Sequence, residues 1–333
     1  MMGFSKHLVA VAAVLTVVHA HPRGGFQFSS ANPAWAVKRA LYNLDDVQDQ
    51  GQKDKLTQGL KDAVTIAAKT LEKMDDDKHK DKLAGWFGDQ RSDDNARETI
   101  RQVYKNFVGD NTDGTGSDTN GNVIVSSTDY WKPTDKQAPG VGDGNTPFCD
   151  LKTSDGKTGT AYFKTNADKK PGMHFCDKVW DRADLAGLTA NNCGGLGNII
   201  DTDRMTKNFI GANVLHEFMH YPRIGKDAVG EQIGDVIYDA FQCRALALDD
   251  DVERRKKTIV NADTYVWYAL HIALEEICGV DFTYPRDERD DDETNQDWPD
   301  SDPETDDPNN GTCDCNENGC TPDSPACCAN GSC

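Results

Sequence analysis

The spacing of apolar residues predicts that the first half of the chain is mainly helical. Between positions 56 and 71 an apolar side chain recurs every three or four residues, which places these side chains on one face of a helix. The segment "NARETIRQVYKNF" repeats this pattern. The two apolar faces consist of Leu56, Leu60, Ala63, Val64, Ala67 and Leu71 in the first segment, and of Ile100, Val103, Tyr104 and Phe107 in the second.

The pattern changes between Gly109 and Gly144, where Gly, Asp, Asn and Thr are frequent. The short β-branched run "NVIVSS" predicts a strand or hairpin between loops. The piece "GDNTDGTGSDTNGN" lacks the alternating oxygen ligands and distal glutamate of a calcium loop, so we expect a surface loop. A second apolar region then leads through "MHFCDKVW" and "NIIDTDRMTKNFIGANVLHEFMH" into long helical patterns that continue to Cys278. The expected fold class is α+β, mainly helical with a small β-sheet.

The N-terminal segment has the pattern of a secretory signal. After Lys6 the apolar run "HLVAVAAVLTVVHA" is short for a membrane span and ends in a Val-His-Ala pattern suited to signal peptidase, which is typical of a signal peptide comprising residues 1–20. No later stretch is long and apolar enough to cross a membrane. We therefore expect a secreted, extracellular protein that does not span the membrane. Lys38-Arg39 is a candidate processing site, although "AWAVKRALYNL" equally fits an ordinary helix.

Charge divides the C-terminal part of the chain from the rest. The formal net charge of the chain is −20. Residues 286–307 contain twelve acidic and two basic residues, so this segment has a net charge of 2 − 12 = −10, which is half of the total. A segment of this composition cannot bury enough apolar surface to fold, so residues 285–312 are expected to form a disordered acidic linker. The preceding residues 21–284 are enough for one folded domain. An acidic chain without a basic face is not expected to bind nucleic acid.

The eleven cysteines agree with an oxidising compartment and form two groups. Six of them lie within residues 313–333, a Cys-rich tail too small to fold without disulfides. The sequons at Asn310 and Asn330 indicate possible glycosylation. The body contains an odd number of cysteines, so one of them is expected to be unpaired or to pair outside its group. The body cysteines are Cys149, Cys176, Cys193, Cys243 and Cys278.

The segment "NVLHEFMHYP" contains the candidate metal-binding and catalytic residues. His216 and His220 are four residues apart and so share one face of a helix, where both can bind one ion. Glu217 lies beside them and can act as general base on a water activated by zinc. Catalytic zinc usually has three protein ligands, so one further ligand is required. A metzincin would provide a third histidine shortly after this motif, whereas this chain has Arg223 and Lys226.

The segments "EQIGDVIYDAFQCRALAL" and "NADTYVWYAL" follow the histidine motif. In this order, the three segments resemble the deuterolysin-like zinc endopeptidases, the aspzincins of fungi. "GWFGD" and "MHFCD" resemble further landmarks of that family. The resemblance is specific from Ile200 to Ala273, weaker from Trp86 to Trp180, and absent from the linker and tail. It implies a zincin-like metallopeptidase domain.

By position, the resemblance implies that Asp235 is the third zinc ligand and that Tyr238 steadies the carbonyl oxygen during cleavage. It also implies that Asp263 lines the pocket for the residue after the cleaved bond and favours a basic side chain there. Lysine-specific members have a glutamate three residues later, at the position of Val266. A helix-capping role for Asp263 is the alternative.

The chain departs from the family pattern around the aspartate. Ile233-Gly234 replaces the usual Gly-Thr, and Asp239 replaces the glycine after the tyrosine. The number of residues between His220 and Asp235 is also larger than in lysine-specific members. Asp227 and Glu231 are therefore alternative third ligands. A thermolysin-like zincin would instead take a glutamate from a helix well downstream, for which Glu275 and Glu276 are the candidates.

These observations predict a secreted zinc endopeptidase that acts on proteins or peptides as a monomer. One alternative is a non-catalytic protein that captures zinc or binds a host protein on the same scaffold. In such proteins the general-base glutamate tends to be missing, whereas Glu217 is present here. Another alternative is an inert structural or adhesive protein with a Cys-rich attachment tail, which would leave the histidine motif unexplained.

Overall fold

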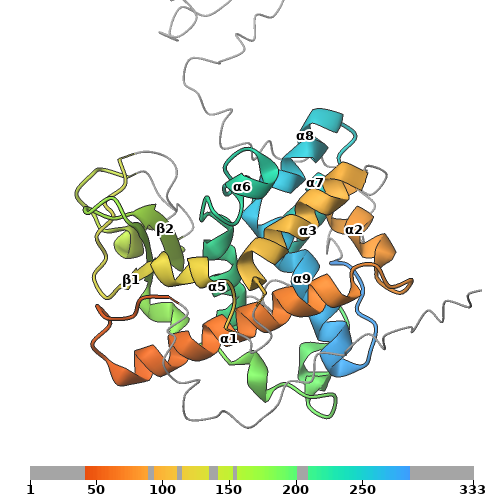
Figure 1. Ribbon diagram of the computed structural model, residues 1–333, viewed down its shortest axis with the longest axis horizontal. Helices are drawn as coiled ribbons and strands as arrows, with labels where there is room; N and C mark the ends of the chain where they lie inside the picture. The colour runs from red at the N-terminus through yellow and green to blue at the C-terminus, as the bar shows by residue number, and fades with distance from the viewer. Residues whose placement is uncertain are drawn as a thin grey trace, which may run out of the picture.

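The computed structural model describes residues 42–88, 94–110, 115–134, 142–152, 156–200 and 209–285. The signal peptide, Lys38-Arg39, the acidic linker from residue 286 onward, both sequons and the Cys-rich tail lie outside these residues. In the described part the fold is α+β, about half helical with one small sheet (Figure 1). The expected fold class is confirmed at this level.

The first three helices are α1 (Gln50–Lys73), α2 (Lys80–Phe87) and α3 (Asp94–Val108). Helix α1 begins where the side chain of Asp49 accepts a hydrogen bond from the backbone N–H of Gln52, which satisfies one of the free amides of the first turn. Its apolar face is buried against α3, α5 and α9. Both helical patterns in the first half of the sequence are thus confirmed.

The sheet has three short strands in the order β1-β3-β2. Strand β1 (Ile124–Ser126) is the predicted β-branched run and pairs in parallel with β3 (Pro171–Phe175). Strand β2 (Ala161–Thr165) pairs antiparallel with β3, with Tyr162 opposite His174. The sheet lies near the N-terminal end of α1, while α2 and α7 lie toward the other end (Figure 1).

The C-terminal helices are α5 (Ile210–Met219), α6 (Lys226–Val229), α7 (Ala240–Leu248), α8 (Val252–Lys256) and α9 (Ala262–Cys278). Helix α9 is apolar on nearly all sides because α1, α2, α5 and α7 surround it. Among the described residues, no helix combines the length and the apolarity needed to cross a membrane.

Two disulfides connect four of the five body cysteines. Cys149 is bonded to Cys176 beside the sheet, and Cys193 is bonded to Cys278 at the end of α9. Cys243 is buried and has no disulfide partner among the described residues, which agrees with the expectation that one body cysteine is unpaired or pairs outside its group.

Candidate metal centre

Helix α5 and its C-terminal cap carry the histidine motif. His216 lies in the last turn of α5, and His220 caps the helix. The opposite side of α5 is fully buried, which fixes the helix in the core. The two imidazoles project from one face, and their ring centroids are 5.0 Å apart. The prediction that the two histidines share one face of a helix is therefore confirmed.

Asp235 meets both imidazoles. Its Oδ1 atom lies 3.0 Å from Nε2 of His216 and 3.2 Å from Nε2 of His220, and the two Nε2 atoms are 3.2 Å apart. Three potential ligand atoms from two segments thus face one point. Ligands bound tetrahedrally to zinc at about 2.0–2.1 Å are separated by about 3.3 Å, so a small outward movement would accommodate the ion.

The other ring nitrogen of each histidine is held by a hydrogen-bond partner. Nδ1 of His216 lies 2.6 Å from Oδ1 of Asp263, and Nδ1 of His220 lies 3.0 Å from the carbonyl oxygen of Ile233. Because neither acceptor carries a hydrogen when Asp263 is ionised, Nδ1 is the donor in both rings. The Nε2 lone pairs of the neutral rings are therefore available to a metal, which is the usual arrangement of metal-binding histidines.

Asn261, the residue directly before α9, holds the loop that contains Asp235. The side-chain oxygen of Asn261 accepts hydrogen bonds from the backbone N–H groups of Val236 and Ile237, at 3.0 and 3.1 Å. Asn261 is fully buried. Asn261 was not predicted from the sequence to be part of the site. Its position at the start of "NADTY" was the only sequence feature that pointed to it. Its contact with the Asp235 loop depends on the tertiary fold.

Asp263 ties the same loop to His216. Its Oδ2 atom accepts the backbone N–H of Asp239 at 3.0 Å, while Oδ1 contacts His216. Both oxygens of this carboxylate are thus engaged within the protein, although the sequence resemblance implied contact with substrate. Asp263 does not act as a helix cap, because α9 has no side-chain cap at its N-terminus.

Tyr238 lies at the open side of the site. Its ring stacks on that of His216, with the centroids 6.2 Å apart, and 56% of the residue is exposed. Its hydroxyl is hydrogen-bonded to Asp235. Desolvation of the hydroxyl and the nearby carboxylates of Asp235 and Asp263 raise the pKa of this phenol well above its ordinary value. Tyr238 is therefore a hydrogen-bond donor at neutral pH.

Glu217 is buried beside the histidines, and burial raises the pKa of its carboxyl group to about 7 despite the opposing effect of His216 and His220. Its Oε2 atom has no hydrogen-bond partner among the described residues. A buried carboxyl oxygen without a partner is costly and commonly marks a functional group. A carboxyl group with a pKa near neutrality is suited to accept a proton and release it again.

The charges at the centre favour a cation. Burial lowers the pKa of His216, but the carboxylates of Asp235 and Asp263 outweigh burial and leave this pKa well above its ordinary value. Desolvation within the cluster likewise opposes ionisation of Asp235, but His220 and His216 bring its pKa well below the ordinary value. Protons on the imidazoles thus balance the carboxylates, and a divalent cation would compete with these protons.

The alternative third ligands do not join this cluster. Asp227 is exposed on α6, and Glu231 is exposed in the following turn. Glu275 lies in the last turn of α9, where it contacts His271 and Lys82, and Glu276 contacts His79. In the described part of the chain, the group around His216 and His220 includes only Asp235 as a carboxylate of metal-binding geometry.

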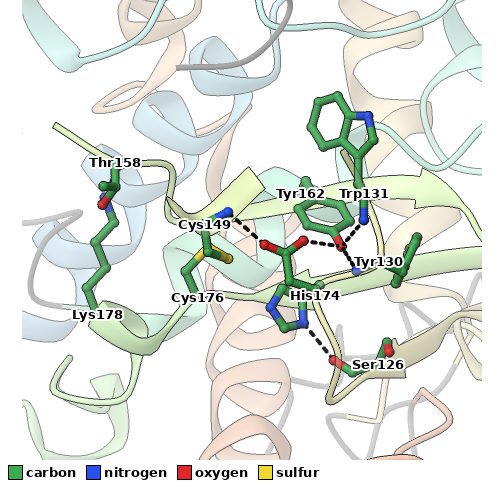
Figure 2. Close-up of a disulfide and its surroundings, with 10 residues drawn as sticks. Ser126, Tyr130, Trp131, Cys149, Thr158, Tyr162, His174, Cys176 and Lys178 are labelled. Atoms are coloured by element: carbon green, nitrogen blue, oxygen red, sulfur yellow. Dashed lines mark hydrogen bonds between the residues drawn. A yellow bond between two sulfur atoms is a disulfide. The ribbon is translucent and has the colours of Figure 1, made fainter. Parts of the chain in front are cut away.

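A second group of potential ligands lies beside the sheet and contains Asp129, Cys149 and His174. The sulfur of Cys149 is bonded to Cys176, so it is not a ligand in this oxidised form (Figure 2). We therefore do not take this group as the candidate catalytic centre.

Comparison with known proteins provides no further assignment, since no protein-family model matches this chain and no curated protein matches it.

Proposed function

We propose that this chain is a secreted zinc-dependent endopeptidase with a zincin-like metallopeptidase domain. The observation that carries the proposal is the convergence of His216, His220 and Asp235 at separations of 3.0–3.2 Å, next to the buried carboxyl group of Glu217. Two imidazoles and one carboxylate leave a coordination position open, which is typical of catalytic zinc. The two described disulfides agree with an extracellular location.

The proposed roles of the residues follow from their positions. His216, His220 and Asp235 would hold the ion, and bound zinc would polarise the scissile carbonyl and acidify a water molecule. Glu217 would accept the proton of that water and deliver it to the leaving amine. Tyr238, a hydrogen-bond donor at the open side, would stabilise the carbonyl oxygen as negative charge develops on it.

Asp263 has a different role in this proposal from the one that the resemblance implied. Because its oxygens contact His216 and the N–H of Asp239, it would orient the histidine and not bind substrate. The proposed activity therefore does not depend on a basic residue after the cleaved bond.

The decisive experiment compares the native protein with Glu217→Gln, after removal of any prosegment. The variant should retain about one zinc per chain, because Glu217 is not a ligand. It should lose hydrolysis of an unfolded protein by about 10²–10⁴-fold, the usual contribution of a general base. Glu231→Gln is the matched control, since this exposed glutamate lies outside the cluster, and it should keep full activity.

Metal analysis distinguishes this proposal from its main alternative. A native protein that is filled with zinc but cleaves no unfolded protein between mildly acidic and neutral pH would contradict the protease and favour zinc capture. Bound iron in place of zinc would instead indicate the two-histidine, one-carboxylate site of non-haem oxygenases.

A further inference from the structure

The disulfide beside the sheet has two additional metal-binding side chains next to it. Ligand atoms of Asp129, Cys149 and His174 all lie within 4.8 Å of one another. Asp129 follows β1, and His174 belongs to β3. His174 and Cys176 are two residues apart in extended backbone, so their side chains lie on the same side of the chain. Two sulfurs, one imidazole and one carboxylate are thus gathered at this place (Figure 2).

The orientation of His174 is that of a metal ligand. Its Nδ1 atom lies 2.8 Å from the carbonyl oxygen of Ser126, which can only accept, so Nδ1 carries the hydrogen. In the neutral ring the lone pair is then on Nε2. His174 is 8% exposed, and the strand pairing opposite Tyr162 fixes its position. A backbone carbonyl that holds the second ring nitrogen is a common feature of metal sites.

Asp129 is also fixed in place. It accepts a hydrogen bond from the hydroxyl of Tyr162 at 3.0 Å and another from the backbone N–H of Cys149 at 2.8 Å. A carboxylate has further lone pairs after two such bonds, so it can still bind a cation. Aromatic residues pack around the disulfide and would limit the access of water: Tyr130, Trp131, Phe148 and Tyr162.

We propose that reduction of the Cys149–Cys176 disulfide creates a second metal site, in which both thiolates, Nε2 of His174 and the carboxylate of Asp129 bind a thiophilic divalent cation such as zinc. A dithiol would supply two electrons and two protons, break the S–S bond and become a cyclic disulfide. Metal binding would then release the two thiol protons. Two thiolates on one zinc are about 3.8 Å apart, a separation that short side-chain rotations reach once the bond is broken.

Cobalt(II) is a suitable probe, because thiolate ligands give it a charge-transfer absorption in the near ultraviolet. The full-length protein is reduced with a dithiol, desalted under argon and titrated with cobalt. The centre at His216, His220 and Asp235 contains no sulfur, so it does not contribute to this absorption. Failure of the second site and failure of the protease proposal are therefore distinguishable.

Other reduced cysteines would also bind cobalt and contribute to the thiolate absorption. The test therefore compares wild type with variants. Reduced wild type should bind about one more cobalt ion per chain with thiolate absorption than the Cys149→Ser/Cys176→Ser protein. His174→Gln should weaken this binding by more than about tenfold. The matched control is Cys193→Ser/Cys278→Ser, which removes the other described disulfide and should keep the extra ion.

Alkylation of the reduced wild type provides a test without substitutions. Bound zinc should protect Cys149 and Cys176 from iodoacetamide but leave Cys193 and Cys278 reactive, as measured by peptide mass spectrometry. Equal cobalt binding by reduced wild type and folded His174→Gln, or alkylation of Cys149 at the same rate with and without zinc, would overturn the proposal.

Discussion

Nδ1 of His216 lies 2.6 Å from Oδ1 of Asp263, and this contact joins α5 to the first turn of α9. The other oxygen of Asp263 holds the backbone of Asp239, four residues after Asp235. One buried carboxylate thus positions a proposed zinc ligand on one helix and the loop that contains another. The separation of the ligands depends on how these two segments pack.

Asp263→Asn should weaken zinc binding without unfolding the protein. The amide has nearly the same volume, but it replaces a charged acceptor for His216 by a neutral one. Loss of such a partner typically costs about 10- to 100-fold in metal affinity or activity. Competition with a chelator measures the affinity, and exposed Asp227→Asn is the control. An unchanged zinc affinity in Asp263→Asn would show that the contact does not position His216.

Asp235→Ala should remove the third ligand. Its Oδ1 atom is 3.0 Å from Nε2 of His216, whereas Asp227 and Glu231 are exposed outside the cluster. Zinc content after dialysis should therefore fall in Asp235→Ala and remain near the native level in Asp227→Ala and Glu231→Ala. If Asp227→Ala loses the metal while Asp235→Ala retains it, the assignment of the third ligand is wrong.

Predictions from the sequence were most successful where all residues of a pattern lie on one helix. The apolar spacing of α1 and α3 and the facing pair His216 and His220 depend only on helical geometry, so all could be predicted locally. Asp235 was selected by resemblance among several acidic residues, and its proximity to the histidines depends on tertiary packing.

Contacts between distant segments could not be predicted in the same way. The contacts of Asn261 with the Asp235 loop and of Asp263 with His216 require α9 to pack against α5. The pairing of Cys193 with Cys278 crosses 85 residues and also follows from the fold. Only one of the three short strands was predicted, since β2 and β3 lack a long alternating pattern.

Asp239→Gly should stabilise the protein by about 1 kcal/mol, because Asp239 has φ 66° and ψ 159°, a region of backbone conformation almost restricted to glycine, which costs a non-glycine residue about 1–3 kcal/mol. The side chain of Asp239 caps α7 by accepting the N–H of Gln242. Replacement of such a cap by glycine costs only roughly a few tenths of a kcal/mol. Urea unfolding measures the change.

The control for this prediction is Asp239→Ala, which loses the cap and keeps the strained backbone. It should destabilise the protein by about 1 kcal/mol. If glycine and alanine destabilise equally, strain at Asp239 does not limit stability.

Glu275 should make the stability of the protein depend on acidic pH. Its carboxylate is buried at the end of α9, accepts the N–H of Phe282 at 2.9 Å and contacts Lys82 at 3.0 Å. Burial raises the pKa of this group, but the contacts with His271, Phe282 and Lys82 outweigh burial and lower the pKa from 4.5 to about 2. The folded state thus binds the proton less tightly than the unfolded state does.

It follows that the ionised carboxylate of Glu275 stabilises the fold fully above its unfolded pKa of 4.5, and that this contribution is lost as the pH falls toward the folded pKa of about 2. Glu275→Gln does not titrate, so its free energy of unfolding should be lower at neutral pH and should decline less steeply over this acidic range. Urea unfolding at several pH values measures both slopes. Glu253→Gln, at an exposed surface ion pair with Lys256, is the control and should retain the wild-type slope. Parallel curves for wild type and Glu275→Gln would show that this carboxylate is not more acidic in the folded protein.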